Sequence, residues 1–438
     1  MNAASVKDAS GLSLNALELG PRRGLRVCMV VYAFYESDTR VLQYATALAE
    51  RGDTVDVLAL RRDDKHAETE IMDGVNVHRI QSRTVNEKGL LTYAYRILRF
   101  LIRSTLVLRR MHREHRYDLI HVHTVPDFLV LAAIFPKWSA VPVILDIHDL
   151  LPELYGSKFK VSNDSFLFKV LTFVERRSAA FATHVIIANH LWRDRLAARS
   201  ATPEKCSVVR NHPDLNIFVA QSAPDRKKNG RFVVIYPGTL NWHQGLDVAI
   251  RAFARVADRI PDADFHIYGE GSAKNSLIEL ANQLGMQDRI TFHGFLPSRE
   301  IARVMAQADL AIEPKRATSA FGNEALSTKI LEFMVLGVPV IASRTRTHML
   351  YYDDSIVKYY DNDDEVELAD AVRLLGSDPM LRREQAARAA KYASENTWQA
   401  RKEEYLQLVE TLVSSNGSTT VSKQTAAGEP DQAFCNKA

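Results

Sequence analysis

Two glutamates with seven residues between them, Glu324 and Glu332, form the most informative pattern in this chain. They lie in FGNEALSTKILEFMVLGVPVIAS, where Ser327 and Thr328 are suited to begin a helix that contains Glu332. A helix N-terminus presents unpaired N–H groups and a positive dipole end, so it can bind a diphosphate without a basic side chain. Glu332 would then accept hydrogen bonds from ribose hydroxyls, and Glu324 would face a sugar beyond the phosphates. The spacing predicts a nucleotide-sugar site.

A solvated helix face is the competing interpretation, because glutamates are common in helices and favour the N-terminal end of the dipole. The neighbouring residues argue against it. Glu332 lies within the apolar run ILEFMVLGVPVIA, where an unpaired carboxylate would be costly.

The segment resembles the hallmark of the family 4 retaining glycosyltransferases, an E-x7-E pattern followed by a small-residue turn and a strand. The resemblance covers roughly residues 24–412. It is also carried by RNHPDLNIF, YPGTLNWHQGLDVAIRAF, FHIYGEGSAKNSLIELA and ITFHGFLPSREIARVMAQADLAIEP. It implies the GT-B fold and sugar transfer from a nucleoside diphosphate, most commonly UDP, with retention and without a metal or other cofactor. The form STKILEFM is associated with a branch found in polysaccharide assembly.

The resemblance also implies a donor site. Glu332 would bind the ribose and Glu324 the donor sugar, and the remaining donor-binding residues would be Gly238, Thr239, Leu326, Ser327 and Thr328. One departure concerns charge, because Thr239 and Gln244 stand where many members carry a phosphate-binding Arg and Lys. Lys329 and Arg316 are the nearest candidates to stabilise the leaving diphosphate. An exposed lysine on the first helical turn is the alternative interpretation of Lys329.

Candidates for the acceptor side occur in the first half of the chain. The stretch YESDTRV has no glycine-rich phosphate fingerprint and offers Glu36, Asp38 and Arg40 instead. By resemblance it is an acceptor-side loop, in which Arg40 would meet an acceptor phosphate; helix capping and mutual pairing are the alternative. His148 would contact the donor sugar, with a core histidine as the alternative, and His123 is assigned to the cleft.

The elements that must position these residues alternate between short β-rich runs and helical patterns, which predicts an α/β protein with parallel strands. The alternation restarts at RFVVIYPG, so we expect two doubly wound domains, residues 24–218 and 219–395. A helix over 396–412 would cross back to the first domain, and the tails 1–23 and 413–438 have disordered compositions. Because ligands bind beyond the carboxyl ends of parallel strands, the candidates should converge on a cleft between the domains.

The composition limits the classes of binding partner and the cellular location that we expect. With 56 basic and 53 acidic residues the net charge is only +3, so nucleic acid is not an expected partner. Three separated cysteines, and no stretch typical of a signal peptide or a spanning helix, predict a cytoplasmic protein. Residues 88–116 hold eight Lys or Arg against one acidic residue, Glu114. This basic helix predicts a peripheral contact with an anionic membrane, whereas a core helix with solvated arginines is the alternative.

The predicted function is therefore retaining, front-face glycosyl transfer from a nucleotide-sugar to a saccharide or a polyprenyl-diphosphate-linked acceptor. Two alternatives remain open at this point. One is a nucleotide-sugar epimerase of the same fold, although no convincing acid/base pair is evident. The other is a noncatalytic GT-B partner subunit, which the two missing cations make conceivable.

Overall fold

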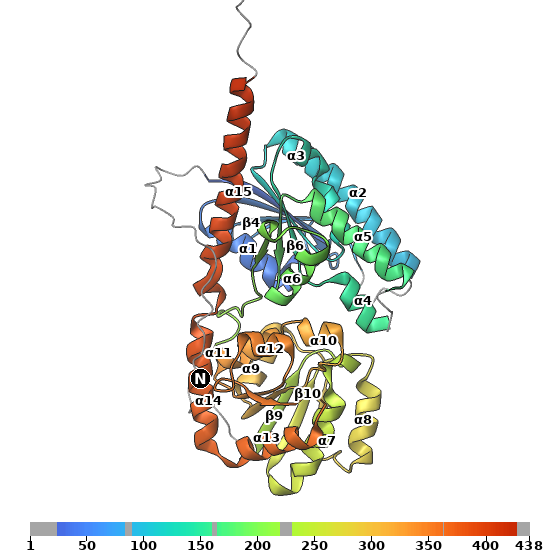
Figure 1. Ribbon diagram of the computed structural model, residues 1–438, viewed down its shortest axis with the longest axis vertical. Coiled ribbons are helices and arrows are strands. Elements are labelled where there is room, and N and C mark those ends of the chain that lie inside the picture. The colour runs from blue at the N-terminus through green and yellow to red at the C-terminus, as the bar shows by residue number, and fades with distance from the viewer. Residues whose placement is uncertain (1–23, 84–89, 160–163, 220–229, 362, 427–438) are drawn as a thin grey trace, which may run out of the picture.

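The computed structural model describes residues 24–426 except 84–89, 160–163, 220–229 and 362. The predicted tail 1–23 and residues 427–438 of the predicted C-terminal tail lie outside the described residues. Within the described chain, two parallel-sheet domains follow one another along the long axis of the molecule (Figure 1).

The first domain contains an eight-stranded sheet in the order β3-β4-β2-β1-β5-β6-β7-β8, parallel except for the β3–β4 pair. Its strands are β1 (Arg26–Val31), β2 (Thr54–Arg61), β3 (Thr69–Met72), β4 (Val75–Ser82), β5 (Leu119–His123), β6 (Val143–Ile147), β7 (His184–Ile187) and β8 (Cys206–Val208). Its helices are α1 (Thr39–Glu50), α2 (Leu90–Glu114), α3 (Ile134–Trp138), α4 (Leu151–Phe159), α5 (Phe166–Phe181) and α6 (His190–Arg199). The central strands β5, β6 and β7 are buried along their whole length, as expected when helices cover both faces of a parallel sheet.

The second domain contains a six-stranded parallel sheet in the order β11-β10-β9-β12-β13-β14. Its strands are β9 (Phe232–Pro237), β10 (Ala263–Tyr268), β11 (Ile290–His293), β12 (Leu310–Glu313), β13 (Val340–Ser343) and β14 (Lys358–Tyr360). Its helices are α7 (Leu246–Val256), α8 (Lys274–Gln283), α9 (Ser298–Ala306), α10 (Ala320–Glu324), α11 (Thr328–Leu336), α12 (Arg346–Tyr351), α13 (Glu365–Ser377) and α14 (Pro379–Ser394). The predicted boundary near residue 219 falls between β8 and β9.

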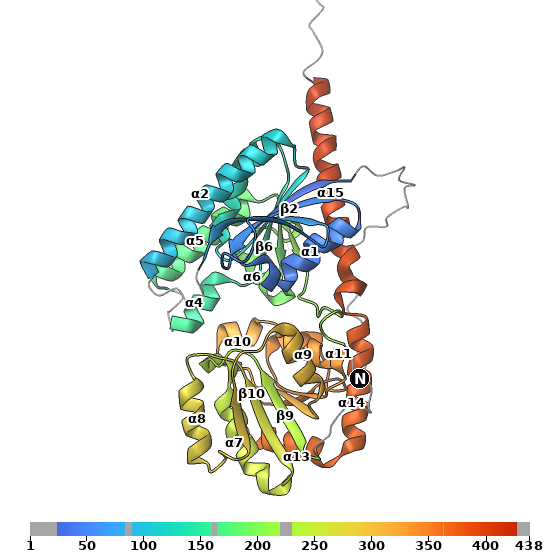
Figure 2. The ribbon, with the colours of Figure 1, turned by 180° about the vertical axis from the view of Figure 1, so that it is seen from behind.

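The last helix, α15 (Trp398–Ala426), leaves the second domain and runs along the first (Figures 1 and 2). Its Tyr405 is fully buried, stacks on Tyr44 with ring centroids 4.2 Å apart, and lies 3.0 Å from His121 Nδ1 through its hydroxyl. The helix is longer than the predicted 396–412 and continues to Ala426, where composition had predicted disorder. Among the described residues, no helix combines the length and apolar character needed to span a bilayer.

Candidate functional site

A cavity of about 430 Å³ opens at the carboxyl ends of β9, β10 and β11. Its lining residues are Pro237, Gly238, Thr239, Tyr268, Gly269, Glu270, Phe295, Leu296, Ile301, Met305, Lys329 and Glu332. One wall is apolar and includes an aromatic ring, whereas Lys329 and Glu332 bring charge from α11. An apolar wall with a few convergent polar groups is the usual composition of a small-molecule site.

Gly238, directly after β9, lets a cation approach the backbone. Its φ of +152° favours glycine, and a Cβ at this position would lie 3.0 Å from both Lys329 Nζ and the Tyr236 hydroxyl. A side chain here would therefore crowd both the ammonium group and the tyrosine hydroxyl.

Lys329 is held inside the cleft and is not the exposed lysine of the alternative interpretation, because its side chain is only 17% exposed. Its Nζ lies 2.7 Å from Glu313 Oε2 and 4.2 Å from the centroid of the Tyr236 ring. Burial disfavours the charged ammonium, but Glu313 outweighs this and raises the pKa of Lys329 above its ordinary value. Lys329 is therefore a fixed positive charge at the cavity.

A second buried lysine, Lys315, was not among the residues predicted from the sequence. Its Nζ donates to the carbonyl of Ala325 at 2.9 Å, and burial lowers its pKa to about 8 while Glu313 opposes that shift. Burial alone would raise the pKa of Glu313, but Lys329 and Lys315 hold it below its usual value. Two lysines thus surround one carboxylate. A signal existed, since Glu313 and Lys315 lie at the carboxyl end of β12.

The N-terminus of α11 carries Lys329 in its first turn. Ser327 precedes the helix without capping it by a side-chain hydrogen bond, and its buried Oγ has no hydrogen-bond partner among the described residues. Leu326 and Thr328 flank it and are half-buried. Burial raises the pKa of Glu332 to about 7, although the Thr328 hydroxyl and Lys329 act in the opposite direction. The segment combines unpaired donors with a carboxyl group poised to ionise near neutral pH.

A second cavity, of about 290 Å³, lies between the two domains. It is lined by Ser37, Asp38, Thr39, Arg40, Gln43, His148, Asn211, His212, Pro213, Asp214, Ile217, Phe218, Ser298, Thr328 and Glu332. Glu332 borders both cavities. The structure therefore brings together Asp38, Arg40 and His148 from the first domain with Thr328 and Glu332 from the second, as the sequence predicted for a cleft.

The first domain's side of this cavity is a hydrogen-bonded cluster around Asp146. Arg40 donates to both oxygens of Asp146, at 2.8 and 2.7 Å, and to the carbonyl of Val209 at 2.8 Å. His123 Nδ1 and His148 Nε2 each lie 3.1 Å from Asp146 Oδ2. Burial opposes protonation of His148, but Asp146 outweighs it and raises the pKa of His148. Arg40 and Asp146 thus orient His148, whereas His123 is fully buried and does not line the cavity.

Comparisons with known proteins agree with this architecture. Residues 37–212 match the model of the glycosyl transferase 4-like domain, and residues 220–395 match that of the glycosyl transferases group 1. The chain belongs to the GT4-like glycosyltransferases of the GT-B fold.

Individual relatives of this GT4-like glycosyltransferase are distant. An uncharacterised glycosyltransferase of Methanocaldococcus jannaschii is 26% identical over 68% of this chain and 74% of its own length. The alpha-D-kanosaminyltransferase of Streptomyces kanamyceticus is 27% identical over 65% of this chain and 75% of its own. Among solved structures, sucrose-phosphate synthase from Thermosynechococcus elongatus superposes with a TM-score of 0.72 at 18% identity, covering 89% of this chain and 100% of that one. Anabaena HepE, solved with UDP and glucose, gives 0.68 at 18% identity, covering 88% and 100%.

In this GT4-like glycosyltransferase, the carboxylate of Glu324, which was predicted to face the donor sugar, is engaged by two arginines. Its carboxylate pairs with Arg195 of the first domain at 2.9 and 2.5 Å and with Arg346 at 3.1 Å. It lines neither of the two cavities. Glu36 is also absent from the cleft lining, and its carboxylate faces Arg79 at 3.8 Å and His66 at 3.6 Å.

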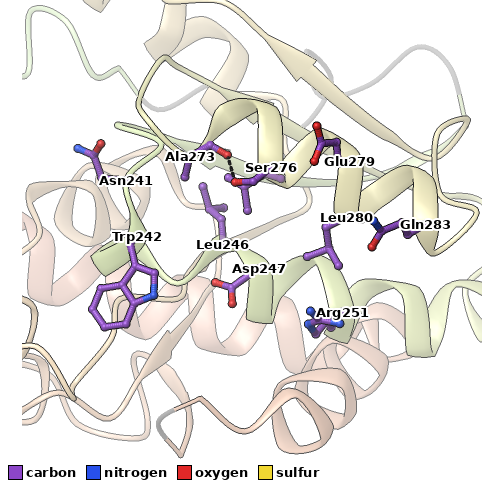
Figure 3. Close-up of a pocket in the computed structure, with 11 residues that line it drawn as sticks. Asn241, Trp242, Leu246, Asp247, Arg251, Ala273, Ser276, Glu279, Leu280 and Gln283 are labelled. Atoms are coloured by element: carbon purple, nitrogen blue, oxygen red, sulfur yellow. Dashed lines mark hydrogen bonds between the residues drawn. The ribbon is translucent and has the colours of Figure 1, made fainter.

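Arg316 differs from its predicted role as well. Its guanidinium group pairs with Asp247 and Asp363, each at 2.6 Å, so it is not directed at the donor cavity. Asp247 and the exposed Trp242 line a separate cavity of about 330 Å³ between α7 and α8 (Figure 3). Of the two cationic candidates predicted from the sequence, Lys329 lines the larger cavity and Arg316 does not.

Proposed function

We propose that this protein is a retaining glycosyltransferase that moves a sugar from a nucleoside-diphosphate sugar, with UDP as the favoured nucleotide, to a saccharide or lipid-linked acceptor. The observation that carries the proposal is the excess of buried positive charge, Lys315 and Lys329 around Glu313, beside the N-terminus of α11. Such a site suits a leaving group that carries two phosphates. The UDP and glucose named for the HepE structure support a nucleotide-sugar donor.

The base, ribose, diphosphate and sugar of the proposed donor bind one after another along the two cavities. The base lies against the apolar wall of the larger cavity, and Glu332, which borders both, accepts hydrogen bonds from the ribose. The diphosphate accepts hydrogen bonds from the backbone N–H groups of Ser327 and Thr328. It also accepts a hydrogen bond from the ammonium group of Lys329, which lies beside Gly238. The sugar then extends toward His148 in the interdomain cavity.

The proposed reaction is a front-face substitution. The bond between the anomeric carbon and the phosphate oxygen breaks, the acceptor oxygen bonds to the same face, and its proton passes to the departing phosphate. Lys329 and Lys315 stabilise the charge that develops on that phosphate. His148, held by Asp146, positions the sugar. The predicted contact between Glu324 and the sugar would require Arg195 to release the carboxylate.

Metal independence is part of the proposal. His121, His123 and Asp146 offer three ligand atoms within 4.8 Å of one another. However, Arg40 occupies both Asp146 oxygens and places a fixed cation where a metal would have to bind. We therefore expect a chelator to leave turnover unchanged; a loss that Mg²⁺ or Mn²⁺ restores would contradict this.

A screen of nucleotide-sugars with saccharides and polyprenyl-diphosphate-linked saccharides tests the function. UDP release that requires an acceptor, with the donor's anomeric configuration kept in the product, is the expected result. Release or isomerisation of the donor without acceptor would indicate the epimerase instead. Tight donor binding without turnover on any acceptor would indicate the noncatalytic subunit. A lipid-linked acceptor would place the enzyme peripherally on the cytoplasmic face of a membrane.

A further inference from the structure

Helix α2 exposes an apolar stripe on the side that faces away from the core. Tyr95, Leu98, Ile102 and Leu106 recur every three or four residues and are each more than half exposed. With 3.6 residues per turn they share one face. The opposite face contributes Ile97, Phe100 and Leu108 to the core. The helix is therefore apolar on two sides, and only one of them has a partner among the described residues.

Helix α5 exposes a second apolar stripe. Phe166 is 84% exposed and Phe173 is 56% exposed, with Val170 between them on the same face. Figures 1 and 2 show α2 and α5 side by side along one flank of the first domain. We call the exposed residues of these two helices the α2–α5 face. Because large exposed apolar patches are rare on soluble monomers, this face is expected to bind something.

The charges on the α2–α5 face are positive except for Glu114, which faces Arg110 at 4.0 Å. Arg99, Arg103 and Arg110 are exposed on α2, and Lys169, Arg176 and Arg177 are exposed on α5. The acidic residues of the two helices are Glu114, at the end of α2, and Glu175, which is buried against Arg199. Apolar stripes bordered by cations match a bilayer of anionic lipid, which offers an apolar interior beneath negative head groups.

The position of the α2–α5 face connects it to the cleft. Helix α5 follows α4, and α4 reaches the second domain, where Ser157 Oγ lies 2.6 Å from Ser319 Oγ at the start of α10. The N-terminal end of α5, with Phe166, is therefore near the boundary between the domains. A substrate anchored in a bilayer under this face would enter the cleft from that end.

We infer that the α2–α5 face binds the surface of an anionic bilayer and so presents the cleft to a membrane-anchored acceptor. The second half of this inference rests on the proposed function, whereas the lipid contact does not. A protein partner or a second copy of the chain would need acidic groups facing the arginines. An anionic bilayer supplies that charge without a specific sequence.

Vesicle sedimentation tests the inference with the full chain. We expect binding to vesicles of equal parts phosphatidylcholine and phosphatidylglycerol, and little binding to phosphatidylcholine alone. The double variant Ile102→Ser with Phe173→Ser should bind the anionic vesicles at least about tenfold more weakly. Arg99→Gln with Lys169→Gln should weaken binding roughly fivefold per cation and reduce its dependence on salt.

Matched controls come from the second domain, where Val366→Ser with Met380→Ser removes similarly exposed apolar groups. Equal binding by the control and the Ile102/Phe173 variant, or equal binding to neutral and anionic vesicles, would overturn the inference. So would a concentration-dependent dimer that Ile102→Ser abolishes in the absence of vesicles. Nucleotide-sugar binding is measured in the same preparations. If the native protein binds vesicles but no nucleotide-sugar, the donor site alone is refuted. If it binds a nucleotide-sugar but no vesicles, the membrane surface alone is refuted.

Discussion

The two domains present different electrostatic designs to the cleft. On the first domain's side, Arg40, His123 and His148 all contact the Asp146 carboxylate, and Arg40 alone makes four hydrogen bonds. The buried Nε2 of His123 has no hydrogen-bond partner among the described residues. On the second domain's side, Lys315 and Lys329 share one ionised carboxylate, Glu313, and Ser327 leaves its hydroxyl without a partner among the described residues. The first cluster is held together by a bidentate ion pair, whereas in the second two ammonium groups share one carboxylate and leave an excess of positive charge for an anionic ligand. We therefore expect the second domain to bind the anion and the first domain to hold His148 in position.

The largest effect should come from removing the charge of Lys329. Lys329→Met should lower turnover roughly 100-fold, because a preorganised donor to the leaving phosphate is lost, and it leaves Glu313 without its closest partner. Steady-state kinetics with saturating donor measures this. Lys402→Met serves as the control and should keep full turnover, because it removes a lysine of α15 that pairs with Glu50 of α1. Turnover within twofold of the native enzyme would refute the role of Lys329.

Replacing Glu332 tests whether the second domain binds the donor. Glu332→Ala should raise the donor Michaelis constant by about tenfold or more with a smaller change in turnover, because hydrogen bonds from the ribose to an ionised carboxylate are lost. Glu384→Ala removes a surface carboxylate of α14 and should change neither value. An unchanged donor Michaelis constant in the Glu332 variant would contradict the ribose contact.

The pH dependence of donor affinity should reflect Glu332 and Lys315 of the second domain. Affinity should rise through about pH 7 as Glu332 ionises, and fall above about pH 8 as Lys315 loses its proton, by roughly threefold on each side. Calorimetric titration of the donor at several pH values measures both limbs. Glu332→Gln should remove the rising limb, and Lys315→Met the falling one. If both limbs persist in these variants, other groups control the affinity.

The smallest effect is expected at the ion pair that joins the domains. Arg195 is partly exposed, so Arg195→Gln should change stability by less than about 1 kcal/mol and turnover by about twofold. Glu324→Gln should behave similarly if Glu324 only tethers the domains. Thermal melting and steady-state kinetics compare the two variants. A much larger loss of turnover in Glu324→Gln would restore the sugar contact predicted from the sequence.

Much of the architecture followed from patterns along the chain. The parallel α/β arrangement was predictable because its strands are nearly continuous apolar runs, as in VILDI of β6. Strand β3 was missed, since its exposed TEIM sequence lies at the sheet edge and carries no burial pattern. Helix α15 was predicted too short, because a polar composition does not show how far a helix continues beyond its last packing contact.

Site residues were predictable where a strand end or a helix start determines their place. Asp38, Arg40, His148, Thr328 and Glu332 all line the interdomain cavity. The ion pairs of Glu324 and Arg316 were not predictable, because their partners come from distant segments of the chain. Arg195 lies 129 residues from Glu324 in the chain. Lys315 was missed although it follows the carboxyl end of β12, because the local sequence does not show that the fold buries it beside Glu313.

The return of α15 to the first domain has a consequence for the order in which the protein is made. Trp398, Tyr405 and Val409 are part of the same core as Val27, Tyr44 and Leu119. Ribosomes release the N-terminal part of a chain first, and domains usually fold as they emerge. Here the first domain cannot complete its core until the second has been translated. The nascent first domain therefore leaves the surface around Tyr44 uncovered during synthesis, and a chain truncated before residue 398 would keep it uncovered.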